Sequence, residues 1–111
     1  MKLLVRLSLA LLIVPHLLNA GPIYGVIFFN GRALRGASIS IECPAVKPFT
    51  GSTLDDGSYR VPVQPQGSCK FTVTSASFKG TASANVISVA DAAPYNFTIV
   101  QSASGYELRK Q

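Results

Sequence analysis

Apolar residues fall at every second position in three short runs of this chain, with polar residues between them. The apolar positions of these runs are Ala37, Ile39, Ile41 and Cys43, then Tyr59, Val61 and Val63, and then Cys69, Phe71 and Val73. Such alternation is typical of a β-strand with one face in the core and the other in solvent. Glycine, proline and aspartate separate the runs, so the pattern predicts antiparallel strands joined by turns.

The rest of the chain continues this pattern and predicts an all-β domain. Strand-like segments occur at Ile23–Asn30, Ala37–Cys43, Thr53–Leu54, Tyr59–Val63, Cys69–Thr74, Gly80–Val89, Tyr95–Gln101 and Tyr106–Lys110. Seven or eight antiparallel strands, with no helix predicted after residue 20, favour an immunoglobulin-like or prealbumin-like β-sandwich. We expect residues 44–52, which hold two prolines and a glycine, to form a loop that cannot pair regularly. Pro62 is expected on the outward side of an edge strand.

The first 20 residues have the pattern of a secretory signal peptide. Lys2 and Arg6 form a basic start, an apolar run follows, and the small residue Ala20 stands before Gly21. The apolar run is interrupted by Pro15 and is short for a membrane span, which needs about 20 residues. An uncleaved membrane anchor is the alternative interpretation.

Residues 21–111 have the length of one small domain, which we expect to be secreted or periplasmic with no membrane span. Cys43 and Cys69 are the only cysteines, and the exported compartment is oxidising. Both are in phase with the core positions of their strands, so we predict that they form a disulfide across the sandwich. Two free buried thiols are the alternative.

Charge excludes one class of partner. The formal net charge is +5, and removal of Lys2 and Arg6 with the signal peptide lowers it by two, to +3. The remaining basic residues are scattered singly apart from Arg109 and Lys110, whereas nucleic-acid binding needs a clustered basic stripe. We therefore predict no nucleic-acid partner and a mild attraction to anionic surfaces or glycans.

Glycines and core positions recur in three segments of the first half of the domain. They read Ile23-x-Gly25-x-Ile27, Asn30-Gly31-Arg32-Ala33-Leu34-x-Gly36-Ala37-x-Ile39-x-Ile41 and Thr53-x-Asp55-x-Gly57-x-Tyr59-x-Val61. Over residues 23–73 this pattern resembles the carboxypeptidase regulatory-like domain, a transthyretin-like β-sandwich. The resemblance implies a non-catalytic module of a secreted or surface protein, and it says little about what the module binds.

Histidine usage argues against catalysis. The single histidine, His16, lies in the predicted signal peptide, so residues 21–111 lack the base of a Ser-His-Asp or Cys-His arrangement and the usual ligand of catalytic zinc. Hydroxyisourate hydrolases share the transthyretin-like sandwich but depend on histidines and a C-terminal Tyr-Arg-Gly-Ser. This chain instead ends Tyr106-Glu107-Leu108-Arg109-Lys110-Gln111. We predict no enzyme activity, no catalytic residues and no cofactor.

Two polar features have competing interpretations. Asp55 and Asp56 would form either a weak calcium site or an exposed turn with Gly57. Asn96 begins a glycosylation sequon, which has meaning only in a eukaryotic secretory pathway. An isopeptide bond of the kind known in related collagen-adhesin domains needs a lysine on the first strand. Residues 23–30 contain none, so Asn96 is expected to be an outward strand residue.

A second apolar stripe defines the candidate interaction surface. Tyr24, Val26 and Phe28 alternate with the core positions of the first strand and are expected to face outward, beside a sheet edge open to strand addition. Cover by residues 44–52, or a swapped register, is the alternative. We predict a structural or protein-interaction module whose partner is another envelope or extracellular protein. A carbohydrate- or small-ligand-binding module is the second hypothesis, although the chain has no tryptophan to stack on a sugar.

Export with cleavage after Ala20 is the first testable prediction. The basic start, the apolar run and the small residue at the cut should direct signal-peptidase cleavage there. Amino-terminal sequencing of the exported protein should begin at Gly21. Recovery of a chain that keeps Met1 in the membrane fraction would contradict the prediction.

Overall fold

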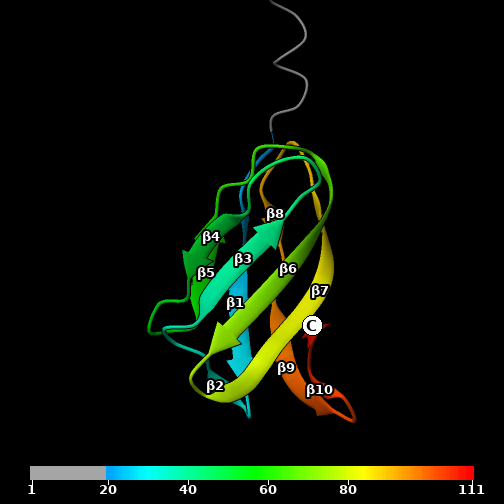
Figure 1. Ribbon diagram of the computed structural model, residues 1–111. Coiled ribbons are helices and arrows are strands. Elements are labelled where there is room, and N and C mark those ends of the chain that lie inside the picture. Colours follow the sequence, from blue (N-terminus) through cyan, green and yellow to red (C-terminus); the bar gives the residue numbers. More distant parts are fainter. Residues whose placement is uncertain (1–19) are drawn as a thin grey trace, which may run out of the picture.

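The protein is a β-sandwich, and Figure 1 shows the computed structural model, which describes residues 20–111 as ten strands in two sheets. No helix occurs in this range. Eight of the strands have at least four residues, so the predicted all-β sandwich of seven or eight strands is confirmed. The predicted signal peptide, residues 1–20, lies outside the described residues apart from Ala20.

One sheet is built around β1 (Ile23–Phe29). Its other strands are β2 (Arg32–Ala33), β5 (Ser58–Val61), β8 (Ala93–Pro94), β9 (Phe97–Ser102) and β10 (Gly105–Lys110). Strand β1 pairs antiparallel with β5 and β2 on one edge and parallel with β8 and β9 on the other. The parallel pairing departs from the antiparallel arrangement that we predicted. Strand β5 has β1 as its one sheet neighbour within the described range, and the exposed Pro62 directly follows this edge strand.

The second sheet has four antiparallel strands in the order β4-β3-β6-β7. Their bounds are β3 (Ser38–Glu42), β4 (Phe49–Ser52), β6 (Gly67–Ser75) and β7 (Phe78–Ser88). The prediction that residues 44–52 cannot pair is wrong for β4, because both prolines precede it and leave its backbone free to pair with β3. The predicted short strand at Thr53–Leu54 is also wrong, since these residues lead into the turn before β5.

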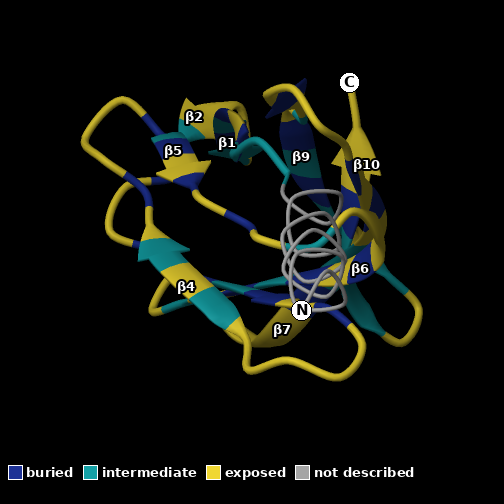
Figure 2. Ribbon diagram, turned by 90° about the horizontal axis from the view of Figure 1, so that it is seen from above, coloured by how far each residue is buried: buried dark blue, intermediate teal, exposed yellow. Residues whose placement is uncertain are grey.

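The core lies between the sheets and consists of the residues that alternation placed inward (Figure 2). Each of the ten apolar residues in the three alternating runs is at most 6% exposed. The ring of Phe71 contacts those of Tyr59 and Phe97, at centroid separations of 5.2 and 5.0 Å, and so joins the two sheets. Burial of one large apolar side chain stabilises a fold by about 1.5–3 kcal/mol, which makes these contacts the main support of the sandwich.

A second aromatic group closes the core between β7 and β10. The rings of Phe29, Phe78 and Tyr106 contact one another at centroid separations of 5.0 to 5.8 Å. These residues come from β1, β7 and β10, so the cluster ties the last strand of one sheet to the last strand of the other. Aromatic pairs in such tilted and edge-on arrangements add about 0.5–1.5 kcal/mol each beyond the burial of their area.

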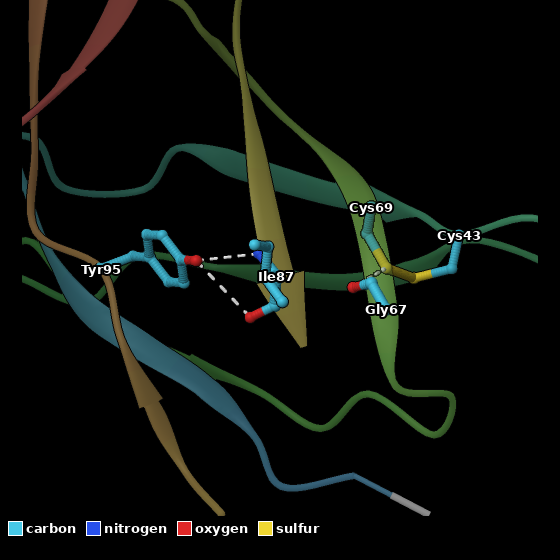
Figure 3. Close-up of a disulfide and its surroundings, with 5 residues drawn as sticks. All are labelled: Cys43, Gly67, Cys69, Ile87 and Tyr95. Atoms are coloured by element: carbon cyan, nitrogen blue, oxygen red, sulfur yellow. Dashed lines mark hydrogen bonds between the residues drawn. A yellow bond between two sulfur atoms is a disulfide. The ribbon is translucent and has the colours of Figure 1, made fainter. Parts of the chain in front are cut away.

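The predicted disulfide between Cys43 and Cys69 is present, but it lies within one sheet (Figure 3). Glu42 of β3 pairs with Lys70 of β6, and continuing this register sets Cys43 opposite Cys69. The two Cα atoms are 4.4 Å apart, which is the spacing of a non-hydrogen-bonded antiparallel pair, about 4.5 Å. The expectation that the bond crosses the sandwich is therefore wrong, because β3 and β6 are neighbours in the same sheet.

Tyr95, between β8 and β9, links the two sheets through polar contacts. The Tyr59 hydroxyl on β5 donates a hydrogen bond to the Tyr95 carbonyl at 2.5 Å. The Tyr95 hydroxyl in turn accepts a hydrogen bond from the backbone N–H of Ile87 on β7, at 2.8 Å (Figure 3). The backbone of Tyr95 can lie close to β1 because residue 25 is a glycine. A Cβ added to Gly25 would lie 2.0 Å from the Tyr95 carbonyl oxygen.

Removing the disulfide tests how much the domain depends on it. The double variant Cys43→Ala/Cys69→Ala should lose about 3.5 kcal/mol of its free energy of unfolding, because the bond closes a loop with a sequence separation of 26. Urea denaturation followed by circular dichroism measures the loss. Equal midpoints for the variant and the oxidised wild type would contradict this prediction.

Alkaline unfolding tests the environment of Tyr59. Burial, with a smaller contribution from Tyr95, raises the pKa of Tyr59 above its ordinary value of 10.0. The hydroxyl of Tyr59 therefore loses its proton at a lower pH in the unfolded chain than in the folded protein. The contribution of this group to the free energy of unfolding is complete below pH 10.0 and is lost as the pH rises above it. Each pH unit in that range should remove up to about 1.4 kcal/mol.

The matched variant is Tyr59→Phe. It should be less stable than the wild type at neutral pH by about 1–3 kcal/mol, because the Tyr95 carbonyl loses its donor. Its free energy of unfolding should also fall less steeply as the pH rises in the alkaline range, because the Tyr59 hydroxyl is missing. Identical slopes above pH 10.0 in urea titrations of both proteins would contradict the assignment.

Candidate functional site

The predicted surface of Tyr24, Val26 and Phe28 faces away from the core. In β1 these residues alternate with buried ones, and none of them belongs to the residues that form or line the core. Tyr24 is 36% exposed, while Val26 and Phe28 are partly buried by their neighbours in the sheet. Strand β4, within the segment 44–52 that we considered as a cover, lies in the opposite sheet.

The sheet edge expected beside this stripe does not exist. Tyr24 pairs with Arg60 of β5 on one side and with Pro94 of β8 on the other, and Phe28 is likewise paired on both sides. Strand addition to β1 is therefore excluded. The edge prediction is wrong because the parallel partners β8 and β9 come from the far end of the chain, which alternation within β1 could not reveal.

The register places two polar residues beside the stripe. Phe28 lies between Ala33 on β2 and Thr98 on β9, and Val100 follows Thr98 on the same face of β9. The guanidinium carbon of Arg60 lies 6.0 Å from the centre of the Tyr24 ring. We call the surface formed by Tyr24, Val26, Phe28 and Val100 the β1 face. It has an apolar centre, with Arg60 and Thr98 at its border.

The outer face of the four-stranded sheet differs sharply from the β1 face. Nine of its outward residues are hydroxyl-bearing: Ser38, Ser40, Thr50, Ser52, Ser68, Thr72, Thr74, Thr81 and Ser83. Its one exposed large apolar residue is Ile87, at the end of β7. The two outer faces of the sandwich therefore differ in chemistry, one covered mainly by small hydroxyl-bearing residues and the other carrying the apolar stripe of β1.

The structure supports the turn interpretation of Asp55 and Asp56. One Asp56 carboxylate oxygen accepts hydrogen bonds from the backbone N–H of Ser58 at 3.0 Å and from its hydroxyl at 2.6 Å. These bonds lower the pKa of Asp56, the side-chain bond most. Gly57 has a φ of 80°, which a turn of this shape requires. Within residues 20–111, no group of three or more potential metal-ligating side chains includes this pair.

Asn96 is exposed but belongs to the link between β8 and β9 instead of a strand. Its side-chain carbonyl accepts a hydrogen bond from the backbone N–H of Val26 at 3.0 Å. The side chain thus replaces a backbone acceptor where the parallel pairing of β1 is interrupted. Glycosylation at Asn96 stays a prediction.

Sequence reasoning missed a set of hollows at the end of the sandwich that carries the turns after β1, β4, β6 and β9, which we call the loop end. One hollow, of about 460 Å³, is lined by Phe29, Asn30, Arg32, Ala33, Leu34, Arg35 and Ser77. A more open hollow, of about 710 Å³, adjoins it through Arg35 and reaches Asp55 and Asp56. Arg32 and Arg35 are scattered singly in the sequence, so no local pattern indicated that they line one hollow.

No family model and no curated protein matches this chain. The resemblance of residues 23–73 to the carboxypeptidase regulatory-like domain therefore stays a prediction made from the residues themselves. The sandwich fold does not by itself define a function, because β-sandwiches serve many unrelated activities.

Proposed function

We propose that this protein is a secreted or periplasmic, non-catalytic β-sandwich module that binds another envelope or extracellular protein through the β1 face. The observation that carries the proposal is the outward apolar stripe of Tyr24, Val26 and Phe28 on a central strand. These positions are free of core contacts, so packing inside this domain does not account for three large apolar side chains there.

The composition of the β1 face suits a protein contact. Burial of apolar surface contributes about 25 cal/mol per Å², and aromatic residues are enriched at the centre of protein interfaces. A polar border around an apolar centre is the usual anatomy of such a contact, and Arg60 and Thr98 provide it here. Because β1 is paired on both edges, we expect side-chain packing onto the sheet face, without backbone pairing to the partner.

The titratable groups support a non-catalytic role. The raised pKa of Tyr59 follows from its burial, with a smaller electrostatic contribution from Tyr95. The Tyr59 hydroxyl is also engaged in a structural hydrogen bond to the Tyr95 carbonyl. The lowered pKa of Asp56 follows from its turn hydrogen bonds with Ser58. Both shifts thus have structural causes, and neither places an acid or base beside a second reactive side chain.

The disulfide and the predicted signal peptide support the secreted or periplasmic location. The bond between Cys43 and Cys69 is compatible with an oxidising environment. Among residues 20–111 there is no helix of the length and hydropathy needed to cross a membrane. The resemblance to carboxypeptidase regulatory-like domains, which accompany secreted and surface proteins, points the same way.

Site-specific photo-crosslinking tests the proposal in the organism that makes the protein. A photoreactive phenylalanine analogue replaces Tyr24 in one variant and Thr74, on the hydroxyl-bearing face, in the other. We expect a discrete protein adduct from position 24 and none from position 74. Adding Phe28→Ser to the first variant should reduce the yield of that adduct severalfold, because it removes apolar area at the centre of the contact.

The controls separate loss of binding from loss of fold. Phe28 is partly buried on an outer face, so Phe28→Ser should lower the free energy of unfolding by no more than about 1–2 kcal/mol. Its thermal unfolding should remain cooperative. If positions 24 and 74 give equal adducts, or neither gives one, the β1 face is not the binding surface.

A further inference from the structure

Two arginines at the loop end form no salt bridge within residues 20–111. Arg32 lies in β2 and Arg35 follows it, and both side chains are exposed. The ion pair found in this range is that of Arg109 with Glu107, on β10. Because an arginine is always charged, Arg32 and Arg35 present two guanidinium groups to solvent.

Both arginines line the same hollow of about 460 Å³. The hollow also receives Asn30 and Ser77, from the turns after β1 and β6, which lie together at the lower end of Figure 1. Phe29 and Leu34 contribute to its lining. Its volume lies within the range of small-molecule sites, about 300–1,000 Å³, and its lining combines fixed charge with neutral hydrogen-bonding groups.

The backbone that carries the arginines is anchored on both sides. The N–H of Leu34 donates to the Ile27 carbonyl at 2.9 Å, and the N–H of Gly36 donates to the Thr53 carbonyl at 3.1 Å. Leu34 itself is 4% exposed and packs into the core. Thus Arg35 projects from a short segment fixed at both neighbouring residues, and little backbone ordering would oppose ligand binding.

We propose that this hollow binds an acidic sugar residue, of the kind that carries a ring carboxylate. The planar guanidinium of an arginine matches a carboxylate in a two-pronged hydrogen-bonded pair, and two such groups line the hollow. The Asn30 amide and the Ser77 hydroxyl can donate to and accept from sugar hydroxyls. The four polar residues of this site are not part of the β1 face, so the inference does not depend on the proposed function.

The surroundings favour a single acid group over a long polyanion. Asp55 and Asp56 line the adjoining hollow, which shares Arg35 with this one. A nucleic acid or a densely sulfated chain that continued in that direction would meet two carboxylates and be repelled. A sugar that presents one carboxylate to the two arginines and hydroxyls elsewhere avoids this cost.

The test titrates galacturonate, a sugar with one carboxylate, into the protein and follows backbone amide shifts by nuclear magnetic resonance. We expect saturable shifts at Asn30, Arg35 and Ser77, and none with the matched neutral sugar galactose at equal concentration. The double variant Arg32→Gln/Arg35→Gln should bind at least about tenfold more weakly, because it loses charge-assisted hydrogen bonds to the carboxylate.

The control variant Lys47→Gln/Lys70→Gln loses the same net charge at exposed positions before β4 and on β6 and should bind as the wild type does. Thermal unfolding confirms that both variants are folded. Absence of saturable shifts overturns the proposal. Equal weakening in both variants, equal shifts with galactose, or equal affinity for inorganic sulfate would also overturn it, since each removes the role of the arginine pair or of the sugar.

Discussion

The pairing of β1 on both of its edges organises the six-stranded sheet and, through it, both candidate surfaces. Its backbone pairs antiparallel with β5 and β2 and parallel with β8 and β9, so strands from both ends of the domain meet on it. Tyr59 and Asn96 complete this arrangement, because they bond the backbone of Tyr95 and Val26 where the parallel pairing is interrupted. Placing β1 at the centre leaves Tyr24, Val26 and Phe28 as a supported platform on the outside of the sandwich.

A domain this small needs more than one way to hold its two sheets together. The ring contacts of Phe71 with Tyr59 and Phe97 cross the centre, and the cluster of Phe29, Phe78 and Tyr106 closes one side. The disulfide acts differently, since it joins neighbouring strands of one sheet and stabilises mainly by restricting the unfolded chain. Hydrophobic packing therefore holds the sheets to each other, while the covalent bond secures the pairing of β3 with β6.

The two surfaces differ in the chemistry that they offer. The β1 face is broad, apolar at its centre and supported by paired backbone on both sides, which suits packing against a folded protein. The hollow at the loop end is small and charged, and turns carry much of its lining, which suits a small polar ligand. The two surfaces meet at Ala33, which pairs with Phe28 of β1 and also lines the hollow.

Local pattern in the sequence determined which residues face the core, where the Asp55–Gly57 turn falls, and that Cys43 and Cys69 could meet. These features depend on a residue and its near neighbours, because alternation and turn chemistry act within a few positions. Tertiary structure decided that β1 is central, that the disulfide lies within one sheet, and that Phe49–Ser52 forms a strand. It also brought Arg32, Arg35 and Ser77 around one hollow. Those outcomes depend on which strands pair, and backbone hydrogen bonds between strands leave no periodic pattern of apolar residues in the sequence of either strand.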